Sequence, residues 1–509
     1  MRTINSIKNI AFSLLLSVTT LIFGFIAQSF FIKTLGIEYT GLNGVFTSII
    51  SVLSIAELGI GSAIIYHLYK PIYENNIEEI KILMHFYKKA YRLIALVVFV
   101  LGIVILPFIT FFVEASLIKE NIYILFLLYI IDASSSYLLA YKRSIIYANQ
   151  KNRIIDLVHL LYVILLNSLQ IIILIYTQNF LFYLFLKIVF RVLENLIISK
   201  IANNLYSFLK ENENIGKIKV QTRNEIIKMV KGQLFHQIAG TIVSSTDTMI
   251  ISTFLSLKFA GIYSNYVMIT TAAHTILSQI FTALTASIGN LLVEKNTEKS
   301  YFYYRIINHI NFMLYSLASI GIFFCINIFI DLWLGSNKFL LPKLWVLFFS
   351  FNFFLQGMRK TIQVFAIAAG ICYENRYVPI LESIVNLIAS LLLVFNFGMN
   401  GVTVGTIIST LVLYLYGFPK YIYAPLFEKQ KKQFIKEFFI SILKYIVIFI
   451  IEFIIISFIN QSFTFNPIIQ LIVNIGLCTT IFILITTLMD KKEKLNKQII
   501  ILIMSNLNK

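Results

Sequence analysis

Charged residues and cysteines are both scarce in this sequence of 509 residues. Asp, Glu, Lys and Arg make up only 13% of it, whereas hydrophobic residues make up 58% and the mean hydropathy is +0.83. A typical soluble chain carries about twice as much charge. The three cysteines, Cys325, Cys372 and Cys478, lack the spacing of metal ligands or of a disulfide framework. The composition therefore predicts a polytopic membrane protein.

Several catalytic signatures are also missing. The chain has no G-x-x-x-x-G-K-[ST] phosphate loop, which excludes ATP hydrolysis by that route, and no H-E-x-x-H or G-x-S-x-G sequence. The net charge of +18 includes no basic stripe with interleaved aromatic residues, so we predict no nucleic-acid partner. These absences favour a transporter without a cofactor over an enzyme.

Long apolar runs fill most of the chain. Each holds about twenty or more residues, enough to cross a membrane as a helix, so we predict an all-α protein with about fourteen transmembrane helices. The predicted spans are residues 10–32, 41–66, 92–113, 121–140, 155–176, 179–201, 229–255, 260–286, 307–330, 344–368, 378–397, 401–419, 439–459 and 467–489. The first run is too long for a signal-peptide core and is expected to stay as a span.

Positive charges lie mostly in alternate connections between these spans. With both termini placed in the cytoplasm, about 32 of the 42 Lys and Arg residues fall in the termini and the cytoplasmic loops. This asymmetry is the one that the positive-inside rule describes. It predicts cytoplasmic N and C termini, and it isolates the few cations that lie within spans.

A weak internal repeat divides the chain into two predicted halves. Residues 35–42 read Leu-Gly-Ile-Glu-Tyr-Thr-Gly-Leu, and residues 255–262 read Leu-Ser-Leu-Lys-Phe-Ala-Gly-Ile. Both repeats begin inside, which predicts two parallel lobes of about six helices each and a transporter with its site between them. The predicted boundaries are 1–203 for the N-terminal lobe, 204–228 for a cytoplasmic linker, 229–420 for the C-terminal lobe, and 421–509 for two extra spans and a tail.

The sixth span carries charges that loops do not explain. Lys187, Arg191 and Glu194 are spaced by four and three residues, so they share one helical face. Because ionisable groups in the bilayer are costly, they usually face a partner or a water-filled cavity. We predict a cationic cavity wall for an anionic substrate, with Arg359 and Lys360 of the tenth span as a second cationic pair. The alternative is a salt bridge between Arg191 and Glu194 that only ties helices together.

Acidic residues within the spans form a second candidate set. It comprises Asp247, Asp132, Glu57 and Glu194, and Asp247 has the most polar surroundings. A buried carboxylate lined by hydroxyl groups can bind Na⁺ or exchange a proton, so coupling to Na⁺ or H⁺ stays open. Each of these carboxylates can equally be a hydrogen-bonded structural group, and no metal ion is assigned.

Three segments carry a family resemblance. They are Leu-Ser-Ile-Ala-Glu-Leu-Gly-Ile-Gly-Ser-Ala-Ile at 53–64, Ser-Ser-Thr-Asp-Thr-Met-Ile-Ile-Ser at 244–252 and Val-Pro-Ile-Leu-Glu-Ser-Ile-Val-Asn-Leu at 378–387. In this order the chain resembles bacterial polysaccharide flippases of the Wzx type along essentially its whole length. That family shares a superfamily with flippases of lipid-linked cell-wall precursors and with multidrug exporters of the MATE type.

The resemblance implies a function in polysaccharide biosynthesis, such as O-antigen or capsule. It implies movement of an undecaprenyl-diphosphate-linked oligosaccharide from the inner to the outer leaflet of the bacterial cytoplasmic membrane by alternating access. The implied partners are the lipid-linked oligosaccharide, membrane lipids and a glycan polymerase. Since a diphosphate needs cations, Lys187 and Arg191 suit this substrate.

Two other functions compete with this interpretation. A cation-coupled multidrug antiporter of the same superfamily would favour an acidic, aromatic cavity. A membrane glycan polymerase or transferase needs a sizeable outer loop, and the longest one here is residues 331–343.

Overall fold

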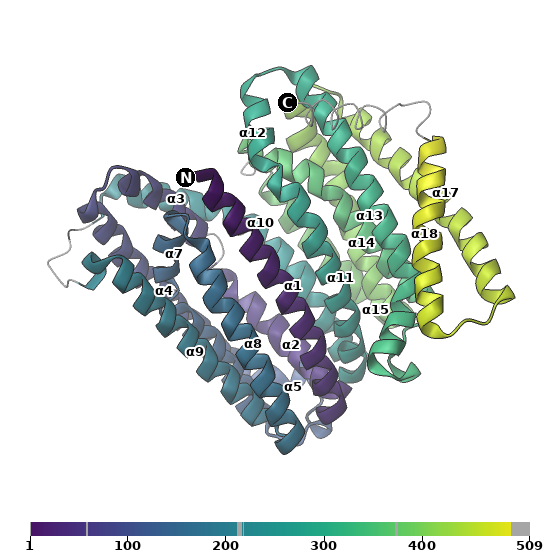
Figure 1. Ribbon diagram of the computed structural model, residues 1–509, viewed down its shortest axis with the longest axis horizontal. Helices are drawn as coiled ribbons and strands as arrows, with labels where there is room; N and C mark the ends of the chain where they lie inside the picture. Colours follow the sequence, from purple (N-terminus) through teal and green to yellow (C-terminus); the bar gives the residue numbers. More distant parts are fainter. Residues whose placement is uncertain (1, 58–59, 211–215, 217, 372–374, 490–509) are drawn as a thin grey trace. The chain divides into compact units, whose positions relative to one another are not determined.

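The computed structural model describes residues 2–57, 60–210, 216, 218–371 and 375–489. These residues are almost entirely helical and include no strand, which confirms the predicted all-α polytopic class. The chain forms two compact units, residues 1–264 and residues 265–509 (Figure 1).

The first unit is a bundle of long helices joined by short turns. Its described helices are α1 (Arg2–Leu35), α2 (Ile37–Leu53), α3 (Ile60–Tyr73), α4 (Ile77–Ile105), α5 (Ile109–Phe112), α6 (Ile122–Tyr137), α7 (Tyr141–Ala148), α8 (Asn152–Thr177), α9 (Phe180–Leu205) and α10 (Val220–Phe254). Four short 3₁₀ turns lie between them, η1 (Ser54–Glu57), η2 (Leu106–Phe108), η3 (Ala115–Leu117) and η4 (Ser207–Lys210).

The second unit follows from α11, which begins in the first unit. Its described helices are α11 (Leu257–Ala283), α12 (Thr285–Val293), α13 (Thr297–Leu334), α14 (Lys343–Ala369), α15 (Tyr377–Val412), α16 (Ala424–Phe427), α17 (Lys431–Ser462) and α18 (Pro467–Met489). The shorter elements are η5 (Asn337–Phe339), η6 (Leu413–Gly417) and η7 (Pro419–Tyr423). Large aromatic side chains dominate its core, including Tyr315, Phe354 and Tyr423.

Eight helices within the described residues are long and apolar enough to cross a membrane, and a ninth span results if the bent pair α6 and α7 counts as one. Some of the predicted spans are not among these helices, because their helix is too short or carries too many charged residues. Helix α2 has only 17 residues, and the middle of α9 carries three charged side chains. The stretch Tyr377–Phe427 counts once, although it contains two of the predicted spans.

The chain reverses within α15. Gly398 has φ 56° and ψ −134°, a conformation that interrupts the helix and favours glycine. On either side of it, Asn386 donates a hydrogen bond to Thr406 (3.1 Å) and Ser390 donates one to the Val402 carbonyl (3.3 Å). These pairs run in opposite directions along the sequence, so the two predicted spans 378–397 and 401–419 form a tight helical hairpin with its turn where a short loop was expected.

The surface of α8 shows why a membrane surrounds the bundle. Leu157, Leu161, Leu165 and Leu169 follow one another every four residues and are all exposed, at 37–52%. In water such an apolar stripe would be unfavourable, whereas in a bilayer it contacts lipid. Helix α1 packs along α8, as Figure 1 shows.

The two repeat sequences meet in the first unit. A Cβ atom on Gly41 would lie 2.0 Å from the Leu257 carbonyl oxygen, and one on Gly261 would lie 2.2 Å from the Ile37 carbonyl oxygen. The contacts are reciprocal, and each glycine allows two helix backbones to approach closely. Helix α10 packs mainly on α2, so the first compact unit extends past the predicted linker at 204–228.

Candidate functional site

Four helices of the first unit bring the candidate charges together: α6, α7, α8 and α9. Side-chain caps start two of them, since Asn121 accepts a hydrogen bond from the Tyr123 amide and Asn179 accepts one from the Leu181 amide, both at 2.9 Å. Helix α7 bends by 42° from α6, and both pack against α9. This arrangement places the charges of α9 beside those of α6 and α7.

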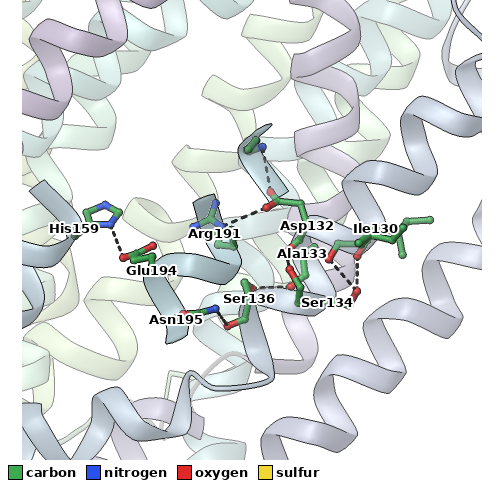
Figure 2. A network of polar contacts seen from close by, with 12 residues as sticks. Ile130, Asp132, Ala133, Ser134, Ser136, His159, Arg191, Glu194 and Asn195 are labelled. Atoms are coloured by element: carbon green, nitrogen blue, oxygen red, sulfur yellow. Dashed lines mark hydrogen bonds and ion pairs between the residues drawn. The ribbon is translucent and has the colours of Figure 1, made fainter. Parts of the chain in front are cut away.

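Asp132 holds two cations of α9. Its carboxylate lies 3.2 Å from Lys187 Nζ and 3.3 Å from Arg191 Nε, as Figure 2 shows for Arg191. Lys187 also lies over the Tyr129 ring at 5.0 Å, and Arg191 over the Tyr162 ring at 5.6 Å. The predicted shared face of α9 is therefore present, with an aspartate of α6 opposite it.

Glu194 forms a second charged group one turn further along α9. Its Oε1 atom lies 3.1 Å from Arg143 of α7 and 2.9 Å from His159 of α8, and the side chain is fully buried. Arg143 also donates a hydrogen bond to Asn195 (2.9 Å), and Asn195 donates one to the Ser136 carbonyl (3.3 Å; Figure 2). Three helices are thus joined through one carboxylate.

The alternative salt bridge between Arg191 and Glu194 does not form. Arg191 pairs with Asp132, and Glu194 pairs with Arg143, so each arginine has its own carboxylate. Removing the arginine of such a pair leaves a buried carboxylate without its counter-charge, at a cost of up to about 3–5 kcal/mol.

A polar cavity of about 340 Å³ opens beside these pairs. Among the described residues, its charged lining consists of Arg143, Arg191 and Glu57, and Tyr91 and Tyr137 line the same cavity. The remaining lining residues are Gly61, Ile65, Ser136, Ala140, Ser144, Tyr147 and Asn195. Two guanidinium groups and one carboxylate thus line the cavity, and each guanidinium is also paired with a second carboxylate, Asp132 or Glu194.

The structure places the other predicted residues elsewhere. Asp247 is a buried residue of α10 that accepts a hydrogen bond from Tyr263 (3.3 Å). In the second unit, Arg359 pairs with Glu382 at 3.0 Å, and Lys360 is the next residue of α14. The candidates therefore form one cluster in the first unit, one separate aspartate and one pair in the second unit. Their roles in binding or coupling stay predictions.

Two residues of the cluster, Arg143 and His159, were not predicted from the sequence. Arg143 lies between the predicted spans 121–140 and 155–176, and His159 lies within the fifth predicted span; neither is among the predicted candidates. A signal for Arg143 was available, because Asp132, Ser136 and Arg143 are spaced by four and seven residues. A helix continued past residue 140 places them on one face. No group of three or more His, Cys, Asp or Glu able to hold a metal ion occurs in the described part of the chain.

No protein-family model matches the sequence, and a search of curated proteins finds no match. Solved transporter structures do match. The lipid II flippase MurJ in an inward closed conformation matches 95% of this chain and 99% of its own, with a TM-score of 0.65 and 14% identity. An inward-facing multidrug resistance MATE family transporter of the MOP superfamily matches 79% of this chain and 93% of its own, with a TM-score of 0.55 and 16% identity.

A mutant of the MATE transporter VcmN from Vibrio cholerae matches 80% of this chain and 95% of its own, with a TM-score of 0.55 and 15% identity. The chain therefore has the fold that these membrane transporters share, which agrees with the predicted superfamily architecture. At this level of identity the likeness extends to the fold and not to a Wzx-type substrate.

Proposed function

We propose that this protein is a flippase that moves an undecaprenyl-diphosphate-linked oligosaccharide from the inner to the outer leaflet of a bacterial cytoplasmic membrane. The observation that carries the proposal is the pair of arginines in the cavity of the first unit. Arg143 and Arg191 come from two different helices, and Glu57 is the carboxylate that lines the cavity with them among the described residues. Guanidinium groups bind phosphate oxygens through paired hydrogen bonds, so two of them suit a diphosphate.

The acidic partners of the arginines fit a transport cycle. Arg191 is held by Asp132 and Arg143 by Glu194, so a bound diphosphate competes with a carboxylate for each cation. This competition keeps binding reversible, which a transporter needs in order to release its substrate. A proton or Na⁺ on either carboxylate would free its arginine for the diphosphate, which is how ion coupling would act in alternating access.

The structural matches support a membrane transporter of either kind, so the choice of a flippase rests on the arginines of the cavity. The match with MurJ covers 99% of MurJ and 95% of this chain. The match with the inward-facing MATE transporter covers 93% of that transporter but only 79% of this chain. About a fifth of this chain thus has no counterpart in that exporter.

A cation-coupled multidrug antiporter is the second candidate. It is favoured by one corner of the cavity, where Glu57 lies beside Tyr91 and Tyr137. A carboxylate among aromatic rings attracts organic cations. The two arginines oppose such a substrate, which is why we place this function second.

Reconstituted vesicles separate the two candidates. The wild-type protein is expected to move a fluorescent undecaprenyl-diphosphate oligosaccharide between leaflets, and Arg191→Ala should reduce the rate to background. Arg191→Lys keeps the charge but loses the paired hydrogen bonds, so it should retain part of the rate. Lys338→Ala, on the exposed turn η5, is the matched control and should behave like the wild type.

The proposal fails if Arg191→Ala moves the diphosphate lipid at the wild-type rate. It also fails if the wild-type vesicles exchange a cationic dye for protons or Na⁺ but leave the lipid in place.

A further inference from the structure

A buried carboxyl group lies in the second unit, outside the sites described above. Glu452 belongs to α17, ten residues before that helix ends, and its side chain is completely buried, with an exposed fraction of 0%. Neither of its carboxyl oxygens has a hydrogen-bond partner among the described residues. Asp132, Glu194 and Glu382, by contrast, each pair with a cation. The burial of Glu452 therefore needs a different explanation.

The groups that face Glu452 come from α13, α17 and α18, and Figure 1 shows α17 and α18 beside one another. Cys478 of α18 interacts with Glu452, and Cys325 of α13 interacts with Cys478. Cys478 is buried at the middle of α18, eleven residues from either end of the helix. Tyr445 lies two turns earlier on α17, and its hydroxyl lies 2.9 Å from that of Ser319. Since a thiol is a weak hydrogen-bond donor, these neighbours offer little to an ionised carboxylate.

Charged residues are distant from Glu452 along the helices packed against it. Helix α18 carries none, and those nearest along the other two helices are Lys444 of α17 and His309 and Asp331 of α13. Lys444 is eight residues away, or about 12 Å of helix.

The turns η6 and η7 also pack on α17, but they contact its beginning. Tyr414 stacks on Phe438, and the Tyr423 ring contacts that of Phe434, at least fourteen residues before Glu452. The other titratable residues of these two turns are Tyr416, Lys420 and Tyr421.

An ionised carboxylate is unstable in such surroundings. Burial of a charge is costly unless the charge is paired, so an unpaired acid inside a membrane protein takes up a proton. Thiols and aromatic rings do not supply the oxygen ligands that hard metal cations need. The described residues also contain no group of three or more His, Cys, Asp or Glu able to hold a metal ion. A proton is therefore the cation that suits this position.

We propose that Glu452 is a proton-binding site, and that its carboxyl group stays protonated at neutral pH within the contact of α13, α17 and α18. Binding of the proton turns the carboxylate into a neutral acid. Its release requires water to reach the buried oxygens, and therefore a local opening between α17 and α18. The site does not involve the arginine cavity of the first unit, so the proposal does not rest on the proposed flippase function.

Infrared spectroscopy of the purified full-length protein in detergent at neutral pH tests this protonation. A protonated carboxyl group has a C=O stretching band that an ionised carboxylate lacks. The wild-type spectrum should contain such a band that Glu452→Gln loses. The matched control is Glu298→Gln, which removes an exposed carboxylate that pairs with Lys429 at 2.7 Å. Its difference spectrum should show loss of the carboxylate bands instead.

Stability gives a second measurement. Glutamine has the shape of a protonated glutamate, so Glu452→Gln should unfold at the wild-type temperature at neutral pH. The folded chain keeps a proton that the unfolded chain releases, so this site makes wild-type stability fall as the pH rises from about 5 to about 8. Glu452→Gln should lack that part of the fall.

Three results would overturn the proposal. One is loss of carboxylate bands, rather than of the C=O band, in Glu452→Gln. Another is a pH dependence of unfolding that Glu452→Gln shares with the wild type. The third is a Glu452→Gln variant that fails to fold or is destabilised as much as Glu194→Gln, which removes a carboxylate with cationic partners.

Discussion

The two units of this chain differ in how many charged side chains they bring together inside the helix bundle. The first unit gathers two carboxylates, two arginines, a lysine and a histidine on four helices beside a cavity. In the second unit, Arg359 of α14 pairs with Glu382, next to a core of packed aromatic rings. The described part of the second unit therefore holds its long helices together without a charged cluster of the kind found in the first unit.

In the second unit, neutral side chains form the hydrogen bonds that hold a helical hairpin together. The helical hairpin of α15 is tied by hydrogen bonds from Asn386 and Ser390, which cost less to bury than charges. Because buried ion pairs contribute little net stability, the larger cluster of the first unit is expected to be kept for binding.

Transport should show the largest difference between the units. Arg143→Ala removes a cavity guanidinium and leaves Glu194 without its arginine, so we expect the flipping rate to fall by about a hundredfold. Arg359→Ala breaks the pair in the second unit, outside that cavity, and should lower the rate by less than about tenfold. The vesicle assay with the fluorescent diphosphate lipid measures both. Equal losses would mean that both units bind the head group.

Stability should differ next. Glu194→Gln leaves Arg143 and His159 without their shared carboxylate, and we expect it to lower the free energy of unfolding by about 3 kcal/mol. Glu382→Gln leaves only Arg359 and should cost less. Thermal unfolding of the purified variants in detergent compares them, and a larger loss for Glu382→Gln would contradict the assignment of the stronger network to the first unit.

The close helix contact of the first unit gives a smaller effect. Gly41→Ala places a Cβ atom against the backbone of Leu257, where only the helices themselves can move, so we expect a loss of about 1–3 kcal/mol. Gly321→Ala in α13 of the second unit is the matched control, since no neighbouring atom lies within 4 Å of its new Cβ. That variant should be neutral or slightly more stable. The same unfolding measurement applies, and equal stability of the two variants would rule out a tight contact at Gly41.

The sequence predicted the membrane class, the helical hairpin at residues 398–400 and the shared face of Lys187 and Arg191, because each depends on local periodicity and apolar length. It did not predict which carboxylate each cation meets. Asp132 and Arg191 are 59 residues apart, and Arg143 and Glu194 belong to different helices, so their pairing depends on tertiary packing. Arg143 was missed because positive charge near a span end is normally explained by the cytoplasmic loops.

Binding of the diphosphate itself tests the central claim most directly. The affinity of the purified protein for an undecaprenyl-diphosphate oligosaccharide is measured for the wild type and for Arg143→Ala/Arg191→Ala, with Arg143→Lys/Arg191→Lys as the variant that keeps both charges. The account predicts that the alanine variant binds at least about tenfold more weakly and that the lysine variant lies between it and the wild type. Equal affinity of the alanine variant and the wild type would contradict it.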